Sequence, residues 1–229
     1  MTCDRDAWQS PYYRYKVDRF DVVVKVTDSA PTFPGPAPGL DKVATVLRER
    51  GIMRILDFGA GKLRNTLYLL RRHWGFNLNA VEFKECFETP EARKNLASAE
   101  RFAGSFRLEY PSQFLSNGER YDAVLLINVL SVIPDPRDRR RVLSECASRL
   151  GTGGLLFWMS QHDEPHYYPG VTQRLRLNDG WCYSLHQRSQ TFFHEFTTGE
   201  IDALVLRRGF KEHSRILAKH HHALLYERL

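Results

Sequence analysis

The sequence predicts an α/β fold: a doubly wound, mostly parallel seven-stranded sheet with helices on both faces and an antiparallel C-terminal strand pair. From Gly39 onward, strand-like and helix-like segments alternate at short spacing, and this alternation is typical of a parallel sheet. The run YDAVLLINV at residues 121–129 is strongly apolar, as expected for a strand that is buried on both faces. Two short apolar runs close the chain and favour the antiparallel edge.

The first half of the alternation predicts three helices, each followed by a strand. Apolar residues between Leu40 and Leu47 share one helical face, and Gly51 stands where a C-terminal cap is expected. A continuous apolar strand covers residues 52–58, and Leu63 to Trp74 has the apolar spacing of an amphipathic helix. The next predicted elements are a strand at 76–83, a helix at 90–99 and a strand at 102–109.

The second half begins with the apolar strand at 121–129. Asp135 followed by Pro136 predicts an N-cap and first turn, and the helix extends to a cap at Gly151. The GTGG turn leads to the strand LLFWMS. Thr197 and Glu200 have the spacing of a capping box, which opens a helix that ends at Gly209. The last predicted elements are strands at 214–217 and 223–226.

Two segments do not follow this alternation. Residues 1–38 contain an aromatic and basic patch (PYYRYK), a strand-like run (DVVVKV) and a proline-rich stretch that reads as an extended connector. Residues 161–196, which follow the fifth strand, are rich in His, Tyr and Trp. We therefore expect an N-terminal extension or lid at 1–38 and one domain at 39–229, with an insertion at about 161–196.

Composition restricts the classes of protein. Apolar residues make up 42% of the 229 residues, which is ample for a packed core. The four cysteines lack CxxC spacing, which argues against a zinc site or a disulfide scaffold and favours a reducing cytoplasm. No apolar run approaches the roughly 18 residues of a membrane span, and the charged N-terminus does not resemble a signal peptide. We expect a cytoplasmic protein that binds neither membranes nor metal ions; its net charge of +6 favours anionic partners.

The stretch RILDFGAGKLRN, residues 54–65, predicts a cofactor site. Gly59, Ala60 and Gly61 follow the first core strand and precede its helix, the place where open parallel sheets bind ligands. Glu82 ends the second strand, where a carboxylate can accept hydrogen bonds from a ribose. The motif lacks the third glycine of a dinucleotide site, because that position holds Arg64, and the P-loop pattern is also missing. Asp57 suits a cationic ligand group.

On these motifs the chain resembles the class I, Rossmann-like SAM-dependent methyltransferases over about residues 39–229. The first motif of that family, acid-x-Gly-x-Gly, is matched by Asp57, Gly59 and Gly61, and its frequent third glycine is Leu63 here. The resemblance implies a transferase that uses S-adenosyl-L-methionine (SAM) as its cofactor. The YDAVLLINV strand, the GTGG turn and the GEIDALVLRRGF helix also resemble the family.

The resemblance also implies further cofactor contacts. The family often has an acid that contacts the adenine amine; Tyr110 occupies that position here, with Glu109 beside it. Asn128 and Val129 end the fourth strand facing the methyl donor. The predicted cofactor-binding residues are therefore Asp57, Gly59, Ala60, Gly61, Glu82, Glu109, Tyr110, Asn128 and Val129.

Candidates for acceptor chemistry lie in the two segments outside the alternation. Methyl transfer needs alignment of the reactants and in some cases a base. His162 and His166, just after the fifth strand, are candidate general bases, with ordinary loop contacts as the alternative. Candidate acceptor-binding residues are Tyr13, Arg14, Trp181 and His194, for which local packing is the alternative.

The acceptor class is left open by the sequence. We expect methyl transfer to an oxygen or nitrogen atom of a small molecule or metabolite. A nucleic-acid acceptor is the alternative: Asn128-Val129-Leu130-Ser131 lacks the prolines of the base-amino motif, but the YYRY run has the composition of a single-strand contact. A non-catalytic SAM-binding partner or sensor and an NAD oxidoreductase also remain possible, and no oligomeric state is predicted.

Overall fold

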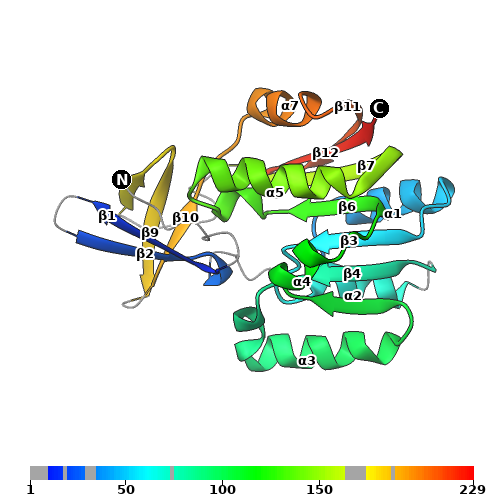
Figure 1. The fold of residues 1–229 in the computed structure, drawn as a ribbon, viewed down its shortest axis with the longest axis horizontal. Helices are drawn as coiled ribbons and strands as arrows, with labels where there is room; N and C mark the ends of the chain where they lie inside the picture. The colour runs from blue at the N-terminus through cyan, green and yellow to red at the C-terminus, as the bar shows by residue number, and fades with distance from the viewer. Residues whose placement is uncertain (1–9, 18–19, 29–34, 73–74, 163–173, 187–188) are drawn as a thin grey trace.

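The computed structural model describes residues 10–17, 20–28, 35–72, 75–162, 174–186 and 189–229, and it confirms the predicted α/β fold. In this part of the chain the main sheet has seven strands in the order β11-β12-β7-β6-β3-β4-β5 (Figure 1). The strands are β3 (Arg54–Phe58), β4 (Asn77–Val81), β5 (Phe106–Glu109), β6 (Tyr121–Ile127), β7 (Leu150–Gln161), β11 (Phe210–Ala218) and β12 (His221–Arg228).

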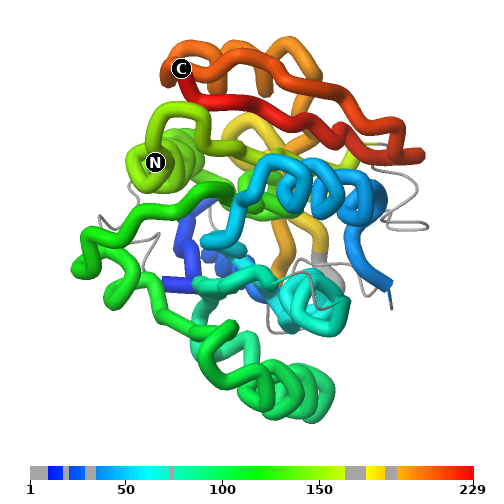
Figure 2. The backbone as a smooth tube through the Cα atoms, turned by 90° about the vertical axis from the view of Figure 1, so that its right-hand side faces the viewer, coloured from blue at the N-terminus to red at the C-terminus, as the bar shows by residue number. Residues whose placement is uncertain are grey.

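The pairings from β7 to β5 are parallel, whereas β12 is antiparallel to both β7 and β11. Figure 2 shows β11 and β12 running side by side along one edge of the molecule, with α3 at the opposite edge. The chain fills the sheet outward from β3 in one direction and then returns to β6. The strand order therefore reverses between β3 and β6, which is where doubly wound sheets bind ligands.

The described helices lie on both faces of the main sheet. Buried residues of α1, α2 and α3 pack in one apolar cluster, and those of α4, α5 and α7 pack in another. The helices are α1 (Leu40–Glu49), α2 (Arg64–Arg71), α3 (Pro90–Ala99), α4 (Pro111–Ser116), α5 (Pro136–Ser148) and α7 (Thr198–Leu206).

Local side-chain chemistry sets where two of these helices begin. The carboxylate of Asp135 accepts a hydrogen bond from the backbone N–H of Arg137 at 2.8 Å, which caps α5. Thr197 and Glu200 form the reciprocal capping box of α7, with Thr197 Oγ1 accepting from Glu200 N at 3.2 Å. Both predicted N-terminal caps are confirmed, whereas the predicted cap at Gly151 is wrong: α5 has Arg149 as its C-cap, and Gly151 belongs to β7.

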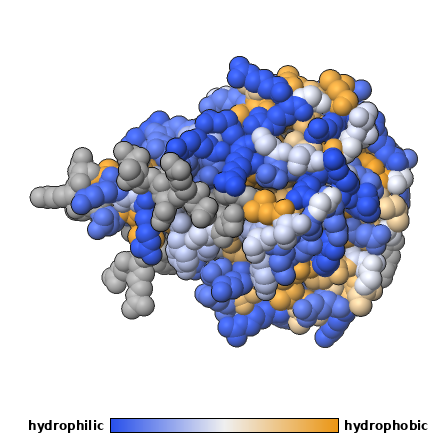
Figure 3. All heavy atoms as spheres, viewed as in Figure 1, coloured by the Kyte–Doolittle hydropathy of each residue, from blue (hydrophilic) through white to orange (hydrophobic). Residues whose placement is uncertain are grey.

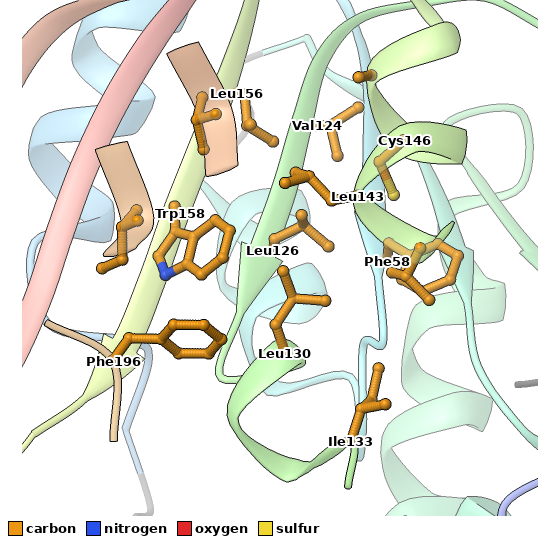
Figure 4. Close-up of a cluster of buried hydrophobic side chains, with 14 of the residues drawn as sticks. Phe58, Val124, Leu126, Leu130, Ile133, Leu143, Cys146, Leu156, Trp158 and Phe196 are labelled. Carbon is orange, nitrogen blue, oxygen red and sulfur yellow. The ribbon is translucent and has the colours of Figure 1, made fainter. Parts of the chain in front are cut away.

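The core between the sheet and α5 is densely packed with large side chains. Figure 4 shows Trp158 of β7 beside Phe196, and Leu126 of β6 facing Leu143 of α5. The rings of Trp158 and Phe196 meet edge to face, with centroids 5.2 Å apart. This core fixes the carboxyl ends of β6 and β7 relative to the segment that leads into α7.

A second sheet, which the sequence did not predict, lies beyond the carboxyl ends of β3 and β6 (Figure 1). Within the described residues it has five strands in the order β1-β2-β10-β9-β8. Its strands are β1 (Tyr12–Val17), β2 (Phe20–Lys25), β8 (Arg174–Leu177), β9 (Gly180–His186) and β10 (Ser189–Phe193). The N-terminal extension and the insertion therefore form one sheet, joined by the parallel pairing of β2 with β10.

One face of the second sheet is buried against the main core. Tyr13, Tyr15, Val22 and Val24 belong to the same apolar cluster as residues of α5. The opposite face of β1 exposes Tyr12, Arg14 and Lys16. The second sheet therefore covers the ligand-binding edge of the main sheet through an apolar contact.

Figure 3 shows a surface on which hydrophilic residues dominate, with smaller apolar spots between them. No helix among the described residues combines the length and hydropathy needed to cross a bilayer.

Candidate functional site

A cavity of about 500 Å³ lies at the carboxyl ends of β3, β4, β6 and β7. Its lining comes from the turn after β3, from the residues after β4 and β6, and from the end of β7. The N-terminal hairpin and the connector at 35–38 line the same cavity. The main sheet and the N-terminal segment thus enclose one space at the strand-order reversal.

The glycine turn forms one side of this cavity. Gly59 and Gly61 have φ values of +69° and +55°, which glycine adopts without strain. The backbone N–H groups of Gly59 and Ala60 both donate to Val81 O, at 2.8 and 3.2 Å. A Cβ at Gly59 would lie 2.6 Å from Val129 Cγ2, whereas a Cβ at Gly61 would meet no atom within 4 Å. The turn thus packs closely on Val129, with open space at Gly61.

Leu63 occupies the position of the third glycine. It precedes α2 with φ +60° and ψ +23°, a left-handed conformation that is unfavourable for a leucine. The side chain is fully buried in the cluster beneath α2. Burial of the side chain compensates the backbone strain.

Glu82 connects the glycine turn to the end of β4. Its side chain lines the cavity and is only 7% exposed. One carboxylate oxygen accepts from Gly61 N at 2.6 Å, and the other accepts from Phe83 N at 2.7 Å. Burial raises the pKa of Glu82, and these two backbone hydrogen bonds oppose that rise.

Asp57 lies beneath the turn and is not one of the described residues that line the cavity. It is 1% exposed, and its carboxylate accepts a hydrogen bond from the Thr66 hydroxyl at 2.6 Å. Burial raises the pKa of Asp57 to about 6; the Thr66 hydrogen bond opposes the rise and the charge of Glu82 adds to it. Asp57 therefore ties β3 to α2.

Glu109 and Tyr110 are not among the described residues that line the cavity. Glu109 is buried and forms an ion pair with Arg107 at 2.8 Å, and Tyr110 is 40% exposed. Pro111, the next residue, does line the cavity. The predicted adenine contact is thus adjacent to the cavity and stays a prediction.

Asn128 and Val129 both line the cavity directly after β6. Asn128 has φ +59°, and its backbone N–H donates to Met159 O at 2.7 Å. Its Oδ1 is buried and has no hydrogen-bond partner among the described residues. A buried amide oxygen without a partner at a cavity is suited to a ligand donor.

Of the four predicted acceptor-binding residues, Tyr13 lines the cavity. It is buried, and its hydroxyl forms a hydrogen bond with Asp138 on α5. Arg14, Trp181 and His194 are not among the described lining residues.

The surroundings of these three residues differ. Arg14 is exposed on the outer face of β1. The guanidinium groups of Arg174 and Arg176 lie over the ring of Trp181, with their Cζ atoms 4.4 and 4.9 Å from the ring centroid. His194 is buried, with Nδ1 2.9 Å from Asp179 O.

Of the two predicted general bases, only His162 is among the described residues. His162 is half-buried, and its ring centroid lies 4.7 Å from that of His222. It is not among the described residues that line the cavity, and His166 lies outside the described residues. No cluster of His, Cys, Asp or Glu suited to a metal ion occurs in the part of the chain that the structure describes.

Several lining residues were not expected from the sequence. They include Lys25 and Asp28, which form an ion pair at 3.1 Å, and Gln161 and His221, which face each other across β7 and β12. The only sequence signal for His221 is the His220–His222 run, which on a strand does not predict one shared face.

Comparisons with known proteins agree on one family. The model of a methyltransferase domain family matches residues 33–214 of the chain. No curated protein sequence matches this chain.

Many solved structures share the fold at low sequence identity. An O-methyltransferase family protein from Burkholderia thailandensis has a TM-score of 0.59 and 19% identity, covering 83% of this chain and 55% of its own. The SAM-bound amino pentose methyltransferase CalS10 from Micromonospora echinaspora has a TM-score of 0.56 and 17% identity, covering 83% and 90%. A SAM-dependent methyltransferase from Methanosarcina mazei has a TM-score of 0.59 and 16% identity, covering 87% and 99%. The chain thus spans about half the length of the Burkholderia protein.

Proposed function

The chain belongs to the methyltransferase domain family as a class I SAM-dependent methyltransferase, and on this premise we propose that it methylates an oxygen or nitrogen atom of a small molecule. The observation that carries the proposal is the cavity of about 500 Å³ at the glycine turn. This volume lies in the range of about 300–1,000 Å³ that is usual for small-molecule sites. The same cavity contains the glycine turn and an apolar side that suits an acceptor.

The described residues fit SAM at one side of the cavity. The open space at Gly61 admits a ligand close to the backbone, and Glu82 has a carboxylate at the place where a ribose is expected. The Oδ1 of Asn128, which has no hydrogen-bond partner in the described part of the chain, suits the ammonium group of the cofactor. Bound SAM supplies a methyl group on a positively charged sulfur. We assign Asp57 the role of adding negative charge beneath the turn, and retain Glu109 and Tyr110 as predicted adenine contacts.

The acceptor is proposed to bind against the side formed by the second sheet and α5. Val132, Ile133 and Val142 line the cavity there together with Tyr13. Three aliphatic side chains and a phenol ring favour an acceptor with an apolar body. The shared fold with CalS10, an amino pentose methyltransferase, supports a small acceptor.

A nucleic-acid acceptor is the second candidate because of one surface feature. Tyr12, Arg14 and Lys16 are exposed together on the outer face of β1. An aromatic ring beside cationic side chains can bind single-stranded nucleic acid. These residues face away from the cavity side of the sheet, so we rank this acceptor below a small molecule.

Two measurements test the proposal. Isothermal titration with SAM and with its demethylated product should show binding of both. Methyl-labelled SAM should then label the low-molecular-mass fraction of a cell extract, and neither nuclease nor protease treatment should remove the label. Nuclease-sensitive label would favour nucleic acid. SAM binding without label in any fraction would favour a sensor, and nicotinamide cofactor binding in place of SAM would favour an oxidoreductase.

A further inference from the structure

Among the described residues, His221 is the histidine that lines the cavity. It begins β12 directly after a two-residue turn, Lys219–His220, in which His220 has φ +59°. Across the strands it pairs with Gln161, which ends β7. Both side chains line the cavity, because paired residues of neighbouring strands point to the same face of a sheet.

The hydrogen bond of the ring fixes which nitrogen carries the proton. His221 Nδ1 lies 2.8 Å from the backbone oxygen of Lys219. A carbonyl oxygen only accepts, so Nδ1 must donate, and in the neutral ring the lone pair then belongs to Nε2. This is the state in which a histidine accepts a proton.

Apolar and polar groups near His221 suit an acceptor with one polar atom. On β7, Met159 and Gln161 line the cavity two residues apart, and both are buried. The amide of Gln161 lies beside the imidazole on the same face of the sheet. Asn128, at the end of the neighbouring strand β6, lines the same cavity.

We propose that His221 is the general base for the methyl transfer and that the acceptor atom is a hydroxyl oxygen. This proposal rests on the proposed function, since it assigns a residue and an acceptor class to that site. The acceptor O–H bond breaks and its proton moves to His221 Nε2. The new O–CH₃ bond forms as the C–S bond of the cofactor breaks, and the electron pair of that bond remains on sulfur. The proton later leaves the imidazole to solvent.

The choice of a hydroxyl over an amine follows from their protonation. A neutral amine already offers a lone pair to the methyl group, whereas a hydroxyl is a poor nucleophile until its proton is removed. An imidazole in the cavity is therefore useful to a hydroxyl acceptor. His162, the described candidate from the sequence, packs on His222 outside the lining.

A pair of variants at the adjacent positions 220 and 221 tests this role. His221→Gln keeps a polar side chain of similar size but cannot accept the proton. His220→Asn changes the adjacent histidine, which is not among the described lining residues, and asparagine tolerates its left-handed conformation. Both variants should bind SAM like the wild-type protein and melt at a similar temperature.

The rate of methyl transfer is measured as the incorporation of labelled methyl into the small-molecule fraction of an extract. We expect His221→Gln to lower kcat about 100-fold or more and to remove the acid limb of the pH profile, with His220→Asn within twofold of wild type. Hot hydriodic acid should release the label as methyl iodide, as it does from O-methyl groups. A His221→Gln rate above half the wild-type rate, or a label that is stable as N-methyl, would overturn the proposal.

An NMR measurement tests the same residue without the acceptor. Long-range ¹H–¹⁵N correlations of the SAM-bound protein, with His221→Gln used for assignment, should report the Nδ1–H tautomer. The Nε2–H tautomer would contradict the inference. Failure of the wild-type protein to bind SAM would instead overturn the proposed function, so the two failures are distinguishable.

Discussion

Asp57 is a single buried carboxyl group whose ionisation opposes folding. Its pKa rises from 3.8 to about 6, so between these pH values the folded state holds a proton that the unfolded state has released. The stability associated with this proton is fully present below pH 3.8 and is lost as the pH rises through about 6. Above this pH range the free energy of unfolding is lower by on the order of 3 kcal/mol.

Asp57→Asn should therefore raise the free energy of unfolding at pH 7.5 by an amount of this order, with little change at pH 4. Asparagine can still accept the hydrogen bond of Thr66. Denaturant unfolding at the two pH values measures the effect, and Asp21→Asn, an exposed position on β2, is the control. Parallel stability–pH curves for wild type and Asp57→Asn would contradict this account. Titration with SAM on the same variant tests whether Asp57 also supports the cofactor.

Leu63 is the N-cap of α2, a position at which glycine should be more stable than alanine. Both Leu63→Ala and Leu63→Gly remove a fully buried side chain, which costs about 2–5 kcal/mol. Glycine alone relieves the strain at φ +60°, so Leu63→Gly should be more stable than Leu63→Ala by about 1 kcal/mol. Denaturant midpoints at constant m-value decide the order, and an alanine variant that is the more stable would show that the backbone is not strained.

At the scale of single residues, the sequence located part of the cavity lining, and the cofactor-binding roles of these residues stay predictions. Gly59, Gly61 and Glu82 could be placed because the turn and the next strand end are local to one βα unit. His221 could not be placed, because its position in the cavity depends on a hairpin that pairs with β7 some 60 residues earlier in the chain. Asp57 was expected to face a ligand, and its burial against Thr66 depends on how α2 packs.

Helix α5 holds the insertion through one buried cation. Arg139 is buried and pairs with Asp179 in the turn between β8 and β9. Asp179→Ala leaves this charge unpaired. The expected loss is about 2–3 kcal/mol, below the value for a fully enclosed pair, because Asp179 is 42% exposed.

The double variant Asp179→Ala with Arg139→Met should recover much of that loss, since both charges of the pair are then removed. Denaturant unfolding of the wild type, both single variants and the double variant completes the cycle. A double variant as unstable as the sum of the single variants would show that the two side chains act independently.

Elements defined by local chemistry were predicted from the sequence, and those defined by remote pairing were not. The caps at Asp135 and Thr197 place α5 and α7 within a short stretch of chain. By contrast, β8 and β9 have few local markers. Their pairing, and that of β10 with β2, depends on contacts between distant segments, which periodicity does not record.

In the whole molecule, the N-terminal extension and the insertion depend on each other. β2 is the only described strand that joins the hairpin β1–β2 to β10. Val24 of β2 is fully buried and pairs with Tyr13 on one side and with Gln190 on the other. Since Tyr13 and Lys25 also line the cavity, the second sheet and the ligand site share residues.

Val24→Asp should therefore unfold all strands of the second sheet together. A carboxylate without a partner in this core loses its hydration without compensation, and amide hydrogen exchange should report lost protection in β1 and β2 and also in β8 to β10. Protection in β3, β4 and β6 should persist, because their pairings do not involve the second sheet. SAM affinity should fall with the loss of the cavity lining.

The neighbouring variant Val23→Asp provides the matched control. Val23 points to the outer face and pairs with Arg14, whose positive charge can accommodate a carboxylate. Exchange in Val23→Asp should resemble that of the wild type. If Val24→Asp instead loses protection in β1 and β2 alone, the extension and the insertion fold independently, and the cooperative unit inferred here does not exist.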